Sequence, residues 1–267
     1  MLKKKQSIKN NSEWQDAFEN SVNIYSRDYI ANKEKATIEH IQRVCSKYHK
    51  VFSGWIAGKD SQVLQMIMEH SGVSFTPIMW KGVNEWPAVK QFIEKEKPSN
   101  LITETIDKFD FEFLERHQEY LFCNGKGVAQ KWMSEKWKRY QKDQKKYGFD
   151  LLVLGRRIKD GNNCGDENYI LHNGGGYDIF APLADWNHEE MFAYIKYNGV
   201  KLSPFYSFPR GFLIGSIAMG EWTEYACKDK TIEQTWEEVY SIDKSVVENA
   251  SKYLTSARDF LARRKMK

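Results

Sequence analysis

Short apolar runs alternate with helical patterns through the middle of the chain. The run VFSGWIA (51–57) predicts a buried strand, and apolar residues recur every three or four positions in the segment 61–72 that follows. A second unit of this kind joins SFTPIMW (74–80) to the helical segment 86–97, whose second residue is a proline. Strands that alternate with helices predict an α/β fold with a twisted parallel sheet covered by helices on both faces.

The alternation continues toward the C-terminus. Further strands are predicted at 101–105, 150–155 and 177–183, and further helices at 28–48, 111–122, 128–147, 188–199 and through most of 222–267. Asn187 is a predicted N-cap, and two glutamates follow it in the first turn of its helix. We expect a polar N-terminal segment (1–25), one α/β domain (26–220) and a helical C-terminal extension (221–267).

Composition agrees with an ordinary globular protein. The chain has 267 residues, of which 41% are hydrophobic and 28% charged, and its net charge is +4. No run approaches the roughly 18 apolar residues that cross a bilayer. The four cysteines (Cys45, Cys123, Cys164 and Cys227) form no CxxC pair, which excludes a zinc ribbon and predicts reduced thiols. We expect a cytoplasmic protein that does not bind membranes.

The turn after the first predicted strand carries the chemistry of a phosphate site. Two glycines allow close approach of backbone amides, two serines offer hydroxyl groups and a lysine adds a cation. These residues are Ser53, Gly54, Gly58, Lys59 and Ser61. Asp60 follows the lysine directly, where it either caps the helix or holds Mg²⁺. An ordinary strand-to-helix turn is the alternative interpretation.

The order of these residues resembles the PP-loop of the adenine nucleotide α-hydrolase superfamily, whose members are ATP pyrophosphatases. Three further stretches resemble its phosphoadenosine phosphosulfate (PAPS) reductase-like branch. They are PIMWKGVNEWPAVKQFIE (77–94), LLVLGRRIKDG (151–161) and IFAPLADWNHEEMFAYIKYNGVKLSPFY (179–206). The resemblance covers about residues 45–220 and implies a Rossmann-like fold of the HUP type.

The resemblance also implies roles for particular residues. Lys59, Asp60 and Arg156 would be catalytic, and Asp60 would bind the Mg²⁺ that accompanies ATP. The implied phosphate ligands are Ser53, Gly54, Gly58, Lys59, Ser61, Gly155, Arg156 and Arg157, and the adenine and ribose would lie near Met79, Trp80 and Gly82. Surface salt bridges with acids such as Asp160 are the alternative for the two arginines.

The chain departs from the family pattern in its loop. Either three extra residues (55–57) are inserted after Ser53-Gly54, or the register is ungapped and Ser53 belongs to the strand. Lys81 and Gly82 also replace the Thr-Gly of the second turn.

The cysteine motifs of the reductases are absent as well. Ser216 and Met219 stand where a cysteine pair is expected in metal-containing relatives, and Met133 stands where some relatives have a cysteine. The C-terminal Glu-Cys-Gly-Leu-His motif is also missing. We therefore expect no iron–sulfur cluster, no zinc and no redox chemistry.

The leading interpretation is an enzyme that binds ATP-Mg and adenylates an unidentified acceptor with release of pyrophosphate. A sulfonucleotide reductase or transferase and a non-catalytic nucleotide-binding module are the alternatives. Residues 125–148 hold eight basic and two acidic residues among four aromatic ones, which suits a nucleic-acid or nucleotide acceptor, although a solvated helix face is the plainer explanation. No histidine is assigned a catalytic role, Trp186 is expected to pack in the core, and the oligomeric state, including a homo-oligomer, stays open.

Overall fold

A computed structural model describes residues 10–82, 86–106, 110–123, 127–215 and 230–266. The chain divides into two compact units, which are described separately. The first comprises Met1–Met79, Glu96–Thr103 and Lys138–Ser203, and the second comprises Trp80–Lys95, Glu104–Trp137 and Pro204–Lys267. The predicted boundaries near residues 25 and 220 stay predictions.

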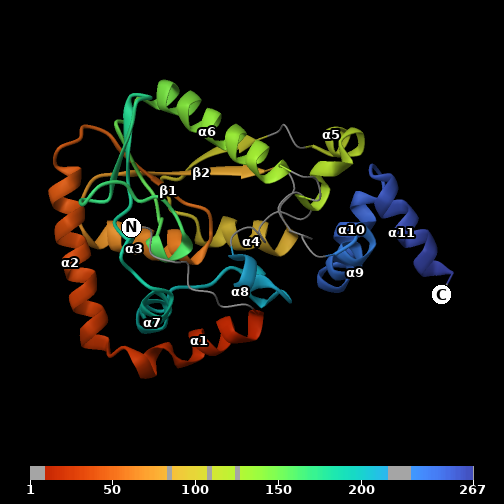
Figure 1. Cartoon of the computed structure of the whole chain (residues 1–267), viewed down its shortest axis with the longest axis horizontal. Helices are drawn as coiled ribbons and strands as arrows, with labels where there is room; N and C mark the ends of the chain where they lie inside the picture. Colours follow the sequence, from red (N-terminus) through yellow and green to blue (C-terminus); the bar gives the residue numbers. More distant parts are fainter. Residues whose placement is uncertain (1–9, 83–85, 107–109, 124–126, 216–229, 267) are drawn as a thin grey trace. The chain divides into compact units, whose positions relative to one another are not determined.

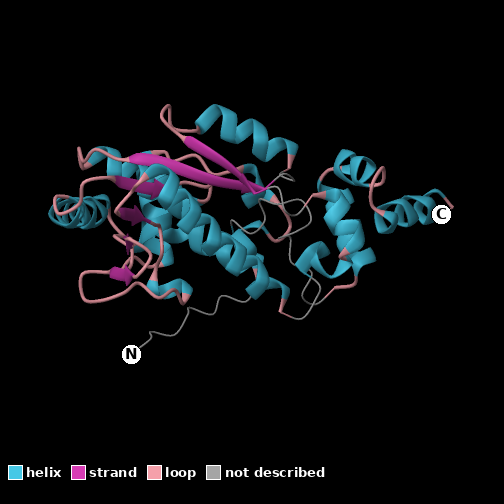
Figure 2. Ribbon diagram, turned by 90° about the horizontal axis from the view of Figure 1, so that it is seen from above, coloured by secondary structure: helices cyan, strands magenta, loops and turns pink. Residues whose placement is uncertain are grey.

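Six strands form one sheet in the order β3-β2-β1-β4-β6-β5. Figure 2 shows strands in magenta with helices beside them in cyan. The strands are β1 (Val51–Gly54), β2 (Thr76–Gly82), β3 (Ile102–Ile106), β4 (Leu151–Val153), β5 (Ile170–Asn173) and β6 (Tyr177–Phe180). Strand β1 pairs in parallel with β2 and β4, and β4 pairs in parallel with β6, while β5 runs antiparallel to β6. The predicted α/β fold is confirmed, with one correction: the edge hairpin makes the sheet mixed rather than wholly parallel.

The strand order contains a switch point beside β1. From β1 the chain moves outward to β2 and β3, and then returns to place β4 on the other side of β1. The loops that follow β1 and β4 therefore leave the same edge of the sheet from two neighbouring strands. From there the chain continues to opposite sides of the sheet. In open α/β sheets this is the place where ligands bind.

The helices of the first unit bury the apolar positions that the sequence predicts. They include α1 (Asn11–Ile24), α2 (Arg27–Cys45), α3 (Lys59–His70), α7 (His188–Asn198) and the C-terminal part of α6 (Val128–Tyr147). In α3 the residues Val63, Ile67 and Met68 are fully buried. In Figure 1, α3 and α7 are drawn below β1.

Two helices test predictions made from the sequence: α7 tests the predicted cap, and α1 tests the predicted polar N-terminal segment. Asn187 caps α7 as predicted, because its Oδ1 accepts a hydrogen bond from the amide of Glu190 at 2.8 Å and the Glu190 carboxylate accepts one from the Asn187 amide at 2.7 Å. Helix α1 lies in the segment that we expected to be merely polar. It packs along α7 and buries Trp14.

The second unit consists mainly of helices. It includes α4 (Pro87–Glu96), α5 (Phe111–Arg116), α8 (Gly211–Ile214), α9 (Ile232–Ile242), α10 (Lys244–Ala250) and α11 (Thr255–Lys265), with short 3₁₀ turns at Gln118–Cys123 and Pro204–Ser207. Trp236 is buried here, contacts Phe122 edge-on at 4.8 Å and donates a hydrogen bond to Ser256 Oγ at 3.2 Å. The predicted helical C-terminus is thus confirmed for α9–α11. Among the described residues, no helix is long and apolar enough to cross a membrane.

Candidate nucleotide site

Ser53 lies inside β1 rather than in the loop. It is paired in register with Pro77 on β2 and with Val153 on β4, and 1% of its surface is exposed. Its Oγ has no hydrogen-bond partner within the described part of the chain. This position matches the ungapped register, in which Ser53 is a strand residue, and its role toward phosphate stays a prediction.

Four residues, 55–58, connect β1 to α3. Trp55 is buried, and its amide donates a hydrogen bond to the carbonyl of Ile78 at 2.9 Å. Ala57 has a φ of +44°, which is uncommon for a residue with a side chain and marks a sharply turned backbone. The loop is therefore anchored at its start and strained near its end.

Ser61 holds the loop against the helix. Its Oγ donates a hydrogen bond to the Gly58 carbonyl at 2.9 Å and accepts one from the Ile56 amide at 3.2 Å. The hydroxyl group thus fixes the shape of the loop from within the first turn of α3.

Helix α3 begins at Lys59, and its N-cap residue is Gly58, which provides no side-chain cap. The alternative that Asp60 caps the helix is therefore wrong, since Asp60 lies within the first turn. The first amides of a helix lack intrahelical acceptors, and the helix dipole adds positive potential there. The start of α3 consequently favours an anion, and it lies at the switch point of the sheet.

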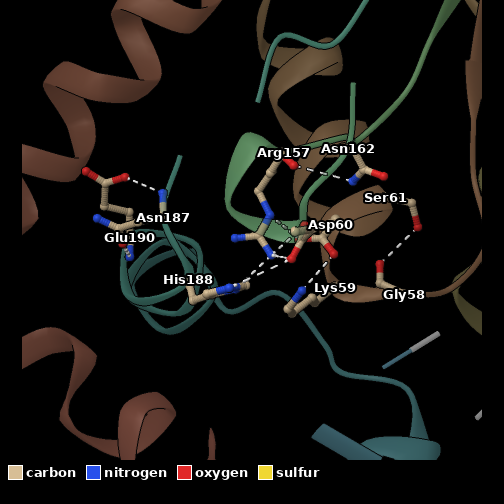
Figure 3. A network of polar contacts seen from close by, with 10 residues as sticks. Gly58, Lys59, Asp60, Ser61, Arg157, Asn162, Asn187, His188 and Glu190 are labelled. Carbon is tan, nitrogen blue, oxygen red and sulfur yellow. Dashed lines mark hydrogen bonds and ion pairs between the residues drawn. The ribbon is translucent and has the colours of Figure 1, made fainter. Parts of the chain in front are cut away.

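Asp60 joins the lysine of the first loop to an arginine of the second (Figure 3). Lys59 Nζ donates a hydrogen bond to Asp60 Oδ2 at 2.7 Å, and Asp60 Oδ1 forms an ion pair with Arg157 Nε at 3.1 Å. Burial lowers the pKa of Lys59. Burial alone would raise the pKa of Asp60, but the charges of Arg157 and Lys59 outweigh it and hold that pKa below its usual value.

The two neighbouring arginines have different surroundings. The Arg157 side chain is fully buried, and its Nη2 donates hydrogen bonds to Asp160 Oδ1 at 3.1 Å and to His188 Nδ1 at 2.9 Å. Arg156 is half-buried, and its Nη1 donates a long hydrogen bond to the Asn163 carbonyl at 3.4 Å. Asp160 was named only in the alternative interpretation of the two arginines, and it is Arg157 that forms a salt bridge with it, through a buried rather than a surface guanidinium.

Gly155 allows the two loops to meet. A Cβ at this position would lie 3.0 Å from the carbonyl oxygen of Asp60 and 3.2 Å from its Cβ. Only glycine permits this approach without a shift of the Asp60 backbone, so the loop after β4 sets the position of the first turn of α3.

The predicted adenine and ribose residues lie on β2. Met79 and Trp80 are buried, and Gly82 is the half-buried last residue of the strand. Their role toward a nucleotide stays a prediction. Trp186 packs in the core as expected, since it is fully buried and its Nε1 donates a hydrogen bond to Thr37 Oγ1 at 3.1 Å.

Two residues beside this cluster, His188 and Trp14, were not predicted from the sequence to belong to the site. His188 is 1% exposed, contacts Arg157 directly and forms a T-shaped contact with Trp14, with ring centroids 4.4 Å apart. Burial, followed by the charges of Arg157 and Lys59, lowers the pKa of His188 to about 3, so its imidazole is neutral at physiological pH. No local motif marks either residue, because their partners come from distant segments.

The described residues contain no cluster of three or more His, Cys, Asp or Glu side chains that could hold a metal ion. Both oxygens of Asp60 already contact a cation, so this carboxylate does not fit the role of a Mg²⁺ ligand in this arrangement. Cys45 and Cys164 are buried, and burial raises their pKa values to about 12 and about 11. Cys227, Ser216 and Met219 lie outside the described residues.

The sequence matches the phosphoadenosine phosphosulfate reductase domain family over residues 32–212. Because the match covers more than half of the chain, the protein belongs to this family, which is part of the adenine nucleotide α-hydrolase superfamily. The resemblance stated from the motifs is thereby confirmed. A comparison with curated proteins finds no match.

Two solved structures are similar to this chain. PAPS reductase from Candida auris, in a phosphate complex, is 15% identical and matches with a TM-score of 0.48 over 67% of this chain and 90% of its own. NMN synthetase from Francisella tularensis is also 15% identical and matches with a TM-score of 0.43 over 86% of this chain and 95% of its own.

Proposed function

We propose that this protein binds an adenine nucleotide, with ATP-Mg as the preferred ligand, and adenylates an acceptor with release of pyrophosphate. Membership of a nucleotide-binding superfamily supports the ligand class. The observation that carries the proposal is the position of Lys59, which is the first residue of α3 and lies at the switch point between β1 and β4.

The phosphates would lie against the first turn of α3. Its amides and the Lys59 ammonium supply positive charge, and the half-buried Arg156 adds a second cation from the loop after β4. Arg157 is fully buried, so its contribution is to hold Asp60 rather than to touch the phosphates. Since Asp60 does not fit a metal-ligand role here, we propose that Mg²⁺ arrives bound to the nucleotide phosphates.

The proposed reaction is a displacement at the α-phosphorus. The nucleophile of the acceptor forms a bond to this phosphorus, while the bond to the bridging oxygen breaks and pyrophosphate leaves with the electron pair. The nucleophile loses its proton to the solvent or to a base on the acceptor. Lys59 and the helix amides stabilise the charge that grows on the leaving pyrophosphate.

A nucleic-acid or nucleotide acceptor is supported by the surface of α6. Tyr140 and Asp143 are buried on one side of this helix, whereas Lys131, Lys138, Lys142, Lys145 and Lys146 are exposed. Exposed lysines along one helix suit a phosphodiester backbone. Such an acceptor would bind along the exposed lysines of α6.

Sulfonucleotide reduction is the second candidate, since the family name refers to that reaction. The reaction needs a thiolate, and the raised pKa values of Cys45 and Cys164 disfavour one at either position. Replacement of Cys227 by serine distinguishes adenylation from sulfonucleotide reduction. We expect Cys227→Ser to retain the enzymatic activity of the wild type, and complete loss of that activity would favour the reductase.

Calorimetric titration with ATP-Mg, AMP, adenylyl sulfate and PAPS tests the proposal. We expect ATP-Mg to bind at least about tenfold more tightly than AMP, because the β- and γ-phosphates contact Lys59 and the helix amides. Preference for PAPS would favour sulfonucleotide chemistry. Binding of ATP-Mg without pyrophosphate release in the presence of candidate acceptors would favour a non-catalytic module.

A further inference from the structure

The guanidinium group of Arg157 is held from three sides. Asp60 on α3 contacts its Nε, and His188 on α7 accepts a hydrogen bond from its Nη2 (Figure 3). Asp160 contacts the same Nη2 at 3.1 Å. The three partners come from segments that are far apart in the sequence. All of them belong to the first unit of the chain.

The partner on α7 has a defined protonation state. Arginine can only donate, so Nδ1 of His188 must be the acceptor and its proton must reside on Nε2. Trp14 of α1 packs against the imidazole in a T-shaped contact, and the imidazole is buried. His188 is therefore a neutral, shielded acceptor with a fixed tautomer.

This arrangement is not the one that stability alone would favour. Within the described residues, Nη1 of Arg157 and Nε2 of His188 are buried without a hydrogen-bond partner, and unpaired buried donors are costly. A buried ion pair is also weak evidence for stability, because hydrophobic residues of similar volume often serve as well. The unpaired buried donors and the buried ion pair are both explained if the cluster holds the Arg157 guanidinium in one orientation.

We propose that His188 is a positioning residue for the phosphate site. By accepting a hydrogen bond from Arg157, it fixes the guanidinium that orients Asp60 and, through Asp60, the ammonium of Lys59. Without this acceptor the Nη2 group has only Asp160 as a partner. The guanidinium then turns toward Asp160 and loosens its contact with Asp60, so that the Lys59–Asp60 pair loses its fixed position.

Two variants separate the acceptor from the bulk of the side chain. His188→Asn places an amide oxygen near the position of Nδ1, whereas His188→Leu fills the space without an acceptor. We expect His188→Leu to bind ATP-Mg at least about tenfold more weakly than the wild type and His188→Asn to remain within about threefold. His172→Leu, at an exposed histidine on β5, is the matched control and should bind as the wild type does.

The inference rests on the proposed function, because the affinity measurement requires a site that binds nucleotides. Nitrogen-15 NMR of the histidine rings provides a measurement that does not. We expect His188, assigned by its absence in His188→Asn, to have an unprotonated Nδ1, and slowly exchanging Arg157 guanidinium signals to persist in His188→Asn but not in His188→Leu.

The outcomes are distinct. If the wild type binds no nucleotide, the proposed function fails, while the NMR spectra still decide the role of His188. A protonated Nδ1 in the wild type overturns the inference even if His188→Leu does not fold. A folded His188→Leu that binds like the wild type, or a His188→Asn that is as weak as His188→Leu, overturns it as well.

Discussion

Among the single residues of the candidate site, the positively charged side chains differ in burial and in their partners. Arg157 is fully buried and contacts Asp60 and Asp160, whereas Arg156, one position earlier, is half-buried. Lys59 has 10% of its side chain exposed and shares Asp60 with Arg157. We infer that Arg157 organises the site, and that Lys59 and Arg156 face the ligand.

Neutral burial of His188 predicts a pH dependence of stability. The folded state holds its pKa near 3, while an unfolded chain has a value near 6.5. The contribution of His188 to the free energy of unfolding is therefore fully present above about pH 6.5. It decreases as the pH is lowered toward 3, because in this range only the unfolded state takes up the proton. From pH 7.5 to pH 5 the loss is about 2 kcal/mol.

Urea denaturation at pH 7.5 and pH 5 measures this loss. Between these two pH values, the free energy of unfolding should fall by about 2 kcal/mol more in the wild type than in His188→Asn. The lowered pKa of Asp60 acts below about pH 4 and lies outside this window, and burial of His40 affects both proteins equally. Equal losses in the two proteins would contradict the neutral burial of His188.

At the scale of elements, the sequence predicts most strands and helices because their apolar patterns are strong. The segment 51–72 shows this well, since β1 and α3 appear where a buried run and a helical period meet. Helix α1 was missed because its surface is mostly polar and Trp14 is its chief apolar contact. Strand β5 was missed because it is a four-residue edge strand, which a local pattern does not distinguish from a loop.

The contacts that Arg157, in the loop after β4, makes with Asp60 and His188 could not be predicted from the sequence, because they join distant segments of the chain. Arg157 and His188 lie 31 positions apart, and their contact follows from where β4 and α7 are placed by the sheet. The sequence did predict that Lys59, Asp60, Gly155 and the arginines serve one site. It did not predict that Asp60 links Lys59 to Arg157, since that depends on side-chain direction and burial.

Replacement of Gly155 tests the close approach of the two loops. In Gly155→Ala the new Cβ forces the Asp60 backbone to shift by a few tenths of an ångström, which disturbs its contact with Arg157. We expect a loss of about 1–3 kcal/mol in the free energy of unfolding, with weaker nucleotide binding.

Gly174→Ala is the matched control for this experiment. Gly174 lies in the turn between β5 and β6, and a Cβ there would meet nothing within 4 Å. Thermal and urea unfolding should leave this variant close to the wild type. Equal stability of the two alanine variants would show that the loops have room to separate.

At the scale of the whole molecule, family membership and strand order lead to the same place. The family match covers 32–212, and this range includes both loops of the candidate site. All the site residues that contact one another (Lys59, Asp60, Arg157, Asp160 and His188) lie in the first unit. The proposed nucleotide site therefore lies within this unit.

Calorimetry of Lys59→Met beside Lys47→Met tests whether the nucleotide phosphates bind at Lys59, as we propose. Methionine retains the length of the side chain without its charge, and Lys47 is an exposed residue just after α2. We predict that Lys59→Met binds ATP-Mg at least about tenfold more weakly than the wild type, while Lys47→Met binds as the wild type does. Equal affinities of a folded Lys59→Met and the wild type would contradict it.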